Sequence, residues 1–229
     1  MNEFFKKIKG GLIVSCQAEG DSPFNNPEDV AKFAVCAQMG GAAAIRTEGV
    51  EKAKAIKENV SLPLIGLVKS AFEDGYVRIT GTEEDVKALT DAGCDMVAID
   101  GTFRQREGMT GPEFILAIKE KYPVLVMADI ATYEEGLACA DAGADCLSTT
   151  LSGYTPETEG IHTSGPNIEL IKKLNEHFSG RTPVIAEGRF NTPDLAKQAI
   201  EAGAWAVVTG SAITRPQVIT KWFYDAITK

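Results

Sequence analysis

The chain has 229 residues, of which 44% are hydrophobic and 24% are charged. This length suits an α/β barrel, so we expect a single domain over residues 1–229. The formal net charge is -9 and no basic run is longer than Lys6-Lys7, which argues against nucleic acid or an anionic membrane as a partner.

The number and spacing of the cysteines indicate that the protein works in a reducing compartment. They are odd in number and show no CxxC spacing, which favours buried, reduced thiols. Near the N-terminus, the apolar run Leu12-Ile13-Val14 is too short for a signal peptide or a membrane span and fits a first strand. We therefore expect a cytoplasmic protein. The five cysteines are Cys16, Cys36, Cys94, Cys139 and Cys146.

One pattern occurs four times: a helix that ends at glycine and leads through a small turn into a buried strand. Glycine is favoured just beyond a helix because the backbone there is left-handed. One copy is weak support for any fold, but four copies spread along the chain indicate repeated β/α units. The copies are residues 37–45, 91–97, 141–147 and 201–207.

Eight apolar runs without strict alternation are typical of buried parallel strands. Helix start signals lie between them, at Thr82, at Thr132 and at Asn191-Thr192-Pro193. Eight strands alternating with helices predict an α/β fold, a single (β/α)8 TIM barrel. The alternative is a doubly wound open sheet, which usually has a glycine-rich phosphate loop after its first strand, and none follows here. The expected strands are 12–16, 42–46, 64–68, 96–100, 124–128, 145–149, 183–187 and 206–210.

Two connections are unusual. Asp74-Gly75, flanked by apolar residues within 72–79, predicts a small hairpin between the third strand and its helix. The segment 151–165, rich in Gly, Thr and Pro, follows the sixth strand and is a candidate lid over a site.

Polar residues follow the expected strands at their carboxyl ends, where barrels of this kind hold their active sites. Several such side chains at one mouth predict a pocket with several functional groups. These residues are Gln17, Arg46, Lys69, Asp100, Asp129, Thr149-Thr150, Glu187-Gly188 and Gly210-Ser211.

Phosphate is the first ligand to consider. Barrels often bind it between the loops after strands seven and eight, and glycine lets the backbone approach an anion. Gly188-Arg189 and Gly210-Ser211 lie in these loops, and Arg215 follows as a possible clamp. Read alone, either glycine is a plain turn residue.

Lys69 and Glu187 are the candidate acid–base pair. Burial lowers the pKa of a lysine and raises that of a glutamate, so the two groups could exchange a proton with a ligand between them. The alternative is a buried ion pair without catalysis. His162 and His177 are the only histidines, and no carboxylate cluster has metal-ligand spacing, so we expect no metal and no cofactor.

Several segments resemble the N-acetylmannosamine-6-phosphate 2-epimerase family, ribulose-phosphate-binding barrels of bacterial sialic acid breakdown. The most specific is Ser-Thr-Thr-Leu-Ser-Gly-Tyr-Thr-Pro at 148–156, and the resemblance covers nearly the whole chain. The other matching segments are Leu-Ile-Val-Ser-Cys-Gln-Ala (12–18), Ala-Ala-Ile-Arg (43–46), Ile-Gly-Leu-Val-Lys (65–69), Met-Ala-Asp-Ile (127–130), Ile-Ala-Glu-Gly-Arg (185–189) and Gly-Ser-Ala-Ile-Thr-Arg-Pro (210–216).

The resemblance implies interconversion of the 6-phosphates of N-acetylmannosamine and N-acetylglucosamine, which differ at C2. After ring opening, Lys69 would abstract the C2 proton to give an enediolate, and Glu187 would return a proton from the opposite face. The resemblance also implies a homodimer and no cofactor. It assigns substrate contacts to Gln17, Arg46, Asp129, Thr150 and Tyr154, and phosphate contacts to Gly188, Arg189, Gly210, Ser211 and Arg215.

Three positions depart from the family pattern. The family commonly has Arg where this chain has Ser70, Pro where it has Gly81, and Ala where it has Gly101. None of these removes a proposed catalytic group, but each affects the third or fourth loop.

Two other functions fit the same residues. A desolvated Lys69 would also suit a Schiff-base lyase or aldolase acting on a sugar phosphate. A sugar-phosphate sensor would keep the pocket without turnover, although a pure binder needs no acid–base pair. The aromatic run Trp222-Phe223-Tyr224 in the last helix suits either a dimer contact or docking onto the chain's own barrel.

Overall fold

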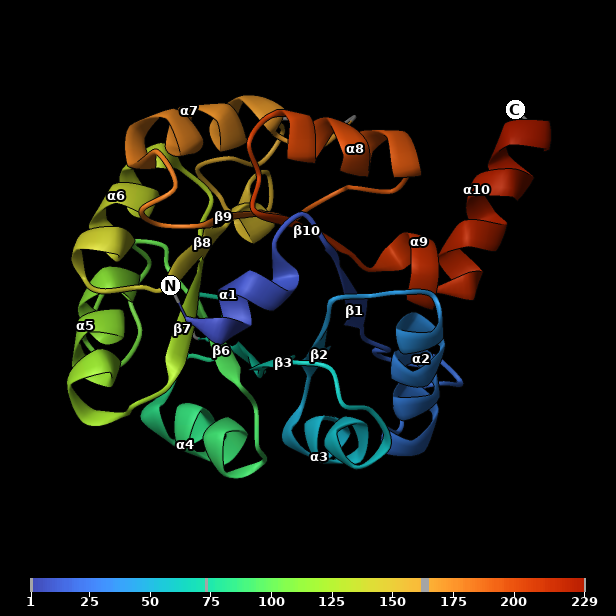
Figure 1. Cartoon of the computed structure of the whole chain (residues 1–229), viewed down its shortest axis with the longest axis horizontal. Helices are drawn as coiled ribbons and strands as arrows, with labels where there is room; N and C mark the ends of the chain where they lie inside the picture. The colour runs from blue at the N-terminus through green and yellow to red at the C-terminus, as the bar shows by residue number, and fades with distance from the viewer. Residues whose placement is uncertain (1, 73, 162–164, 229) are drawn as a thin grey trace.

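The computed structural model describes residues 2–72, 74–161 and 165–228, so His162 and part of the candidate lid lie outside the described residues. Eight parallel strands close into a barrel in the order β1-β10-β9-β8-β7-β6-β3-β2 (Figure 1). Because β1 pairs with both β10 and β2, the predicted TIM barrel is confirmed and the open sheet is wrong. The strands are β1 (Leu12–Cys16), β2 (Ala44–Glu48), β3 (Leu64–Leu67), β6 (Met96–Asp100), β7 (Leu125–Asp129), β8 (Cys146–Ser148), β9 (Val184–Ala186) and β10 (Ala206–Thr209).

Helices surround the barrel and begin where their capping residues predict. The Thr82 side chain accepts a hydrogen bond from the Asp85 backbone N–H, and Thr132 forms a capping box with Glu135. Thr192 caps the helix that starts at Pro193. The surrounding helices are α2 (Pro27–Met39), α3 (Val50–Asn59), α4 (Glu83–Asp91), α5 (Gly111–Lys121), α6 (Tyr133–Asp141), α7 (Ile168–Phe178) and α8 (Pro193–Glu201).

The repeated glycines lie just beyond helix ends and have left-handed backbones. Their φ angles are +88° at Gly41, +84° at Gly93, +92° at Gly143 and +97° at Gly203. A side chain in that conformation is strained, so the sequence repeat marks four places where a helix must stop and turn into the barrel.

A short helix, α1 (Glu3–Ile8), was not expected from the sequence. Phe4, Phe5 and Ile8 are buried against residues that point into the barrel, such as Ile13. Trp205 Nε1 donates to the Phe5 carbonyl oxygen at 2.9 Å. The helix therefore covers the end of the barrel where the strands begin and leaves the carboxyl ends of the strands for a site.

The predicted hairpin is present as the antiparallel pair β4 (Lys69–Ala71) and β5 (Val77–Ile79). The barrel strand β3 already ends at Leu67. Lys69 is therefore not the last residue of a buried strand, as the apolar run suggested, but the first residue of the hairpin.

The chain ends in the short α9 (Ser211–Thr214) and in α10 (Pro216–Thr228), which projects away from the barrel (Figure 1). No residue of α10 is buried, and Phe223 and Tyr224 are 71% and 62% exposed. Docking onto the chain's own barrel therefore does not account for these aromatic residues. Within the described part of the chain, none of the helices has the length and apolar character needed to cross a membrane.

Candidate active site

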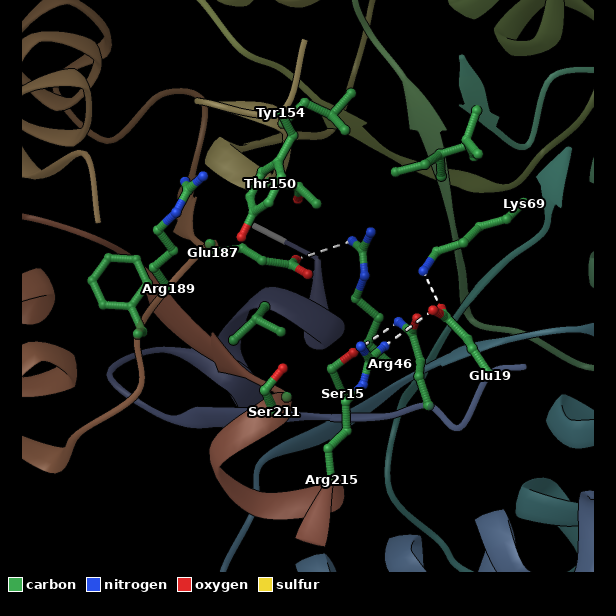
Figure 2. A pocket seen from close by; sticks show the side chains of 18 of the residues that line it. Ser15, Glu19, Arg46, Lys69, Thr150, Tyr154, Glu187, Arg189, Ser211 and Arg215 are labelled. Carbon is green, nitrogen blue, oxygen red and sulfur yellow. Dashed lines mark hydrogen bonds and ion pairs between the residues drawn. The ribbon is translucent and has the colours of Figure 1, made fainter. Parts of the chain in front are cut away.

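A cavity of about 620 Å³ opens at the carboxyl ends of the strands (Figure 2). Its volume is in the range of small-molecule sites. It brings together all the candidate site residues except Asp129, which lies beneath it. The predicted residues in its wall are Gln17, Arg46, Lys69, Thr150, Tyr154, Glu187, Gly188, Arg189, Gly210, Ser211 and Arg215.

The floor of the cavity is a buried charge network centred on Arg46, from β2. Its Nη2 lies 2.5 Å from Asp129 Oδ2, at the end of β7, and its Nη1 lies 3.2 Å from Glu187 Oε2, just beyond β9. Asp129 is fully buried and also accepts a hydrogen bond from Thr150 Oγ1 at 2.7 Å. Asp129 therefore holds Arg46 and Thr150 in place from below.

Glu187 has a raised pKa, as expected. Burial is the largest cause, the Asp129 charge adds to it, and Arg46 together with hydrogen bonds from Thr150 and Ser148 opposes it. The carboxyl group thus keeps its proton to a higher pH than an exposed glutamate does. This property suits a group that donates a proton to a ligand.

Lys69 occupies a different environment from the one expected. It is exposed, and its ammonium group pairs with the Glu19 carboxylate. The expectation of a desolvated Lys69 is therefore wrong, because the hairpin strand that carries it stands outside the barrel wall. This removes the basis for the Schiff-base interpretation. A buried Lys69–Glu187 pair is also wrong, since each group has another partner.

Lys69 and Glu187 nevertheless enter the cavity from opposite sides, with Arg46 between them (Figure 2). One basic and one acidic group therefore face a ligand from two directions. Such an arrangement can remove a proton from one face of a carbon and return it to the other.

Glu19, in the loop after β1, is a site residue that the sequence interpretation missed. One of its oxygens contacts Lys69, and the other lies 3.3 Å from Arg215 Nη2. Burial acts to raise the pKa of Glu19, but the hydrogen bond from Lys69 and the charges of Lys69, Arg215 and Lys52 hold it below its usual range. The sequence signal that could have identified Glu19 as a site residue is its place three residues after the end of a strand.

The two glycine loops lie side by side in the cavity wall. Gly188 has φ +101°, a conformation that a side chain would strain. A Cβ on Gly210 would lie 3.2 Å from Ser15 Cβ, so the end of β10 approaches β1 closely. Both glycines line the cavity, and neither carries a side chain that would separate its backbone from a ligand.

The Arg189 side chain turns toward the loop after β8. Its guanidinium group donates to the Ser152 and Gly153 carbonyl oxygens at 3.0 and 3.1 Å and lies 4.0 Å from the centre of the Tyr154 ring. This stacking supports Tyr154 at the cavity rim (Figure 2). At Arg189, the backbone is thus better placed for phosphate than the side chain.

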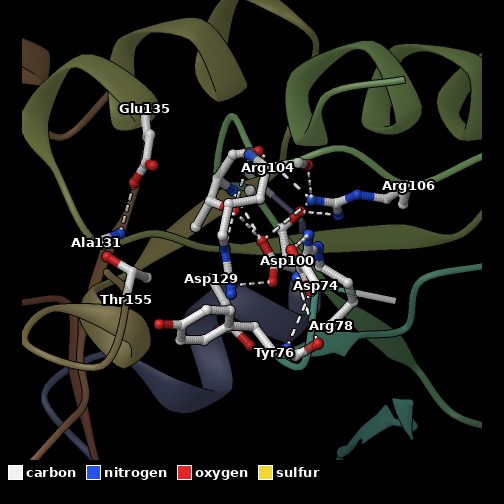
Figure 3. Close-up of polar contacts among 12 residues, drawn as sticks. Asp74, Tyr76, Arg78, Asp100, Arg104, Arg106, Asp129, Ala131, Glu135 and Thr155 are labelled. Carbon is white, nitrogen blue, oxygen red and sulfur yellow. Dashed lines mark hydrogen bonds and ion pairs between the residues drawn. The ribbon is translucent and has the colours of Figure 1, made fainter. Parts of the chain in front are cut away.

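A second charge network fixes the hairpin that carries Lys69 (Figure 3). Arg78 of β5 is buried, pairs with Asp74 at 2.5 Å and donates to the Gln105 carbonyl oxygen at 3.1 Å. Asp100, the last residue of β6, does not line the cavity. It pairs at 2.7 Å with Arg104, which lies in the loop after β6 together with Gln105. Arg104 in turn reaches the cavity wall, which the sequence interpretation did not foresee.

Two departures from the family pattern have packing reasons. A Cβ on Gly81 would lie 2.7 Å from the Phe72 ring, and a Cβ on Gly101 would lie 2.7 Å from Cys139 Sγ. A neighbouring side chain thus fills each space. Nothing in the structure explains Ser70. Among the residues that the structure describes, no group of three His, Cys, Asp or Glu is placed to hold a metal ion.

The chain is a (β/α)8 barrel with a cavity, lined by acidic and basic side chains, at the carboxyl ends of its strands. The family model described as "Putative N-acetylmannosamine-6-phosphate epimerase" matches residues 30–229. Two relatives, each described as "Putative N-acetylmannosamine-6-phosphate 2-epimerase", come from Caldanaerobacter subterraneus and Escherichia coli O157:H7. The first relative is 50% identical, and the match covers 98% of this chain and 94% of the relative. The second is 49% identical, and the match covers 96% of this chain and 93% of the relative.

Solved structures agree with this result. The N-acetylmannosamine-6-phosphate 2-epimerase from Clostridium perfringens has a TM-score of 0.90 and 42% identity, covering 98% of this chain and 96% of that one. A thiamine phosphate pyrophosphorylase from Pyrococcus furiosus shares the fold alone. Its TM-score is 0.63 and its sequence identity is 19%, over 99% of this chain and 100% of that one. The chain belongs to the N-acetylmannosamine-6-phosphate epimerase family.

Proposed function

We propose that this chain interconverts N-acetylmannosamine 6-phosphate and N-acetylglucosamine 6-phosphate in sialic acid breakdown. The observation that carries the proposal is the placement of Lys69 and Glu187 on opposite sides of one cavity in a member of this family. The two sugars differ only in configuration at C2, so the reaction needs a proton removed from one face of that carbon and one added to the other.

The C2 proton is acidic only beside a carbonyl, so the sugar reacts as its open-chain aldehyde. Lys69 Nζ takes the proton from C2, the C1–C2 bond gains double-bond character, and the aldehyde oxygen becomes an enediolate oxygen. Glu187 then donates its proton to C2 from the other face. The raised pKa of Glu187, caused mainly by its burial, lets the carboxyl group keep this proton to a higher pH than an exposed glutamate does.

Arg46 stabilises the enediolate oxygen, because its guanidinium group lies in the cavity wall next to Glu187. Gln17, Thr150 and Tyr154 contact the hydroxyl and acetamido groups, and Asp129 orients Arg46 and Thr150 from beneath. Lys69 must leave Glu19 and lose its proton before it can act as the base.

The phosphate group binds between the loops after β9 and β10. The backbone at Gly188-Arg189 and Gly210-Ser211 approaches it, and Arg215 supplies a positive charge. The left-handed Gly188 and the tight fit of Gly210 against Ser15 favour backbone contacts there.

The experiment is a proton NMR time course with N-acetylmannosamine 6-phosphate and with unphosphorylated N-acetylmannosamine. The wild type is expected to form the gluco epimer from the phosphorylated sugar, while Lys69→Met and Glu187→Gln are expected to lose at least about a hundredfold in rate, the lower range for general acid–base catalysis. Binding without epimer formation by the wild type would favour a sensor instead. Borohydride trapping of the sugar on Lys69, with carbon–carbon cleavage, would favour a lyase.

The chain further forms a homodimer to which α10 contributes contacts, and it works in the cytoplasm. The support for the dimer is the exposed apolar side chains of α10, with Phe223 at 71% and Ile227 at 82%. The support for the cytoplasm is that four of the five thiols are buried singly. Sedimentation equilibrium should give twice the chain mass, and Phe223→Lys with Ile227→Lys should give the monomer mass; an unchanged mass would contradict the role of α10.

A further inference from the structure

Glu19 occupies the position of an internal counter-ion in the cavity. Its carboxylate contacts Lys69 with one oxygen and Arg215 with the other, so it joins the candidate base to the candidate phosphate clamp (Figure 2). All three side chains line the same cavity. In the free protein, the two cations are therefore already paired.

The pairing joins residues that are far apart in the sequence, unlike the pairs within single helices. Glu19, Lys69 and Arg215 come from three separate segments: the loop after β1, the hairpin, and the junction of α9 and α10. Their side chains are 38%, 33% and 30% exposed, so water screens the contacts only in part. A further cation, Lys52, also lowers the pKa of Glu19 through its charge, but it pairs with Glu48 at 3.0 Å.

A phosphorylated ligand at Arg215 would meet a carboxylate already in contact with that guanidinium group. Two anions on one cation repel each other, and the repulsion is stronger where water is partly excluded. Either the ligand binds weakly beside Glu19, or Glu19 leaves. Glu19 is exposed and lies in a loop, so it can turn outward without disturbing the barrel.

We propose that Glu19 is a specificity-determining residue: its carboxylate neutralises Lys69 and Arg215 in the free protein, and a phosphorylated ligand binds by displacing it. The inference rests on the phosphate site of the proposed function. Weakly held anions do not displace Glu19, whereas a dianionic phosphate that also gains the backbone contacts of Gly188 and Gly210 does. Displacement also releases Lys69 from its carboxylate partner.

The test is a calorimetric titration of the intact protein with inorganic phosphate at fixed ionic strength, at pH 7.5. Wild type is compared with Glu19→Gln and Glu19→Ala. The control is Glu48→Gln, which removes one negative charge near the cavity but from a residue outside its wall. Circular dichroism of each variant checks the fold.

Removal of the competing carboxylate should tighten phosphate binding up to about fivefold in both Glu19 variants, the upper end of the range for one partly exposed ion pair, and leave Glu48→Gln at about the wild-type affinity. Phosphate affinity that is unchanged or weaker in the Glu19 variants would overturn the proposal, and so would equal tightening in Glu48→Gln. Epimer formation is measured separately. Tightening without wild-type turnover would leave this inference standing while the proposed function fails, and turnover without tightening would do the reverse.

Discussion

Arg46 offers the sharpest test of the buried network. In Arg46→Met, the side chain keeps an unbranched apolar stem but loses the guanidinium group, leaving Asp129 buried without its cationic partner. Arg46 and Asp129 are 1% and 0% exposed, and their closest N–O distance is 2.5 Å. Breaking a buried pair of this kind costs about 3–5 kcal/mol, because one charge stays behind without compensation.

A surface pair in the same chain provides the matched control. Lys87 and Asp91 also lie 2.5 Å apart, but each side chain is 64% exposed. Lys87→Met should cost far less stability than Arg46→Met, since water screens the exposed pair. Both substitutions thus break an ion pair with the same contact distance and introduce the same residue. The main difference between the two pairs is how deeply they are buried.

Urea unfolding followed by circular dichroism measures both losses, and thermal unfolding should show Arg46→Met melting about 6–20 °C below the wild type. In the double variant Arg46→Met with Asp129→Leu, part of the loss should be recovered, because both charges of the Arg46–Asp129 pair are removed and only Glu187 is left without its guanidinium partner. A loss below about 1 kcal/mol for Arg46→Met, within the range of exposed pairs, would refute the reasoning that this network is shielded from water.

Three further predictions concern separate features. The folded protein binds the Glu187 proton more tightly than the unfolded chain, so stability falls as pH rises from the ordinary value of 4.5 through the raised pKa; Glu187→Gln should flatten this part of a urea-midpoint profile. Gly143→Ala should cost about 1 kcal/mol in urea unfolding through its positive φ alone, and Gly203→Ala more, because a Cβ there would also overlap a neighbouring side chain. Arg78→Met should lower kcat more than it raises KM in the epimerase assay, because Arg78 fixes the hairpin that carries Lys69; a change in KM alone would contradict this.

The barrel could be predicted because its signals are local. A glycine beyond each of four helices, a capping residue before others and continuous apolar strands each follow from a few neighbouring residues. The candidate site could be predicted for the same reason, since residues at strand ends meet at one mouth in any closed barrel. Glu187 is one such residue, and its raised pKa follows from its position beyond a buried strand.

The remaining features depend on contacts between distant segments. Lys69 follows an apolar run, but whether it ends the barrel strand or begins the hairpin is decided by its pairing with Ile79, ten residues further on. The role of Glu19 depends on Lys69 and Arg215, which no local pattern places beside it. The helix α1 is only six residues long, too short for its apolar residues to show a helical period clearly.

The most direct test of C2 proton transfer is exchange in D2O, followed by proton NMR from each epimer separately. The wild type should incorporate deuterium at C2 and form the other epimer from either sugar phosphate. With N-acetylmannosamine 6-phosphate, Glu187→Gln should still exchange the C2 proton through Lys69 without inversion, whereas Lys69→Met should leave that proton in place. Epimer formation by the wild type with the C2 proton fully retained would contradict two-sided proton transfer between Lys69 and Glu187.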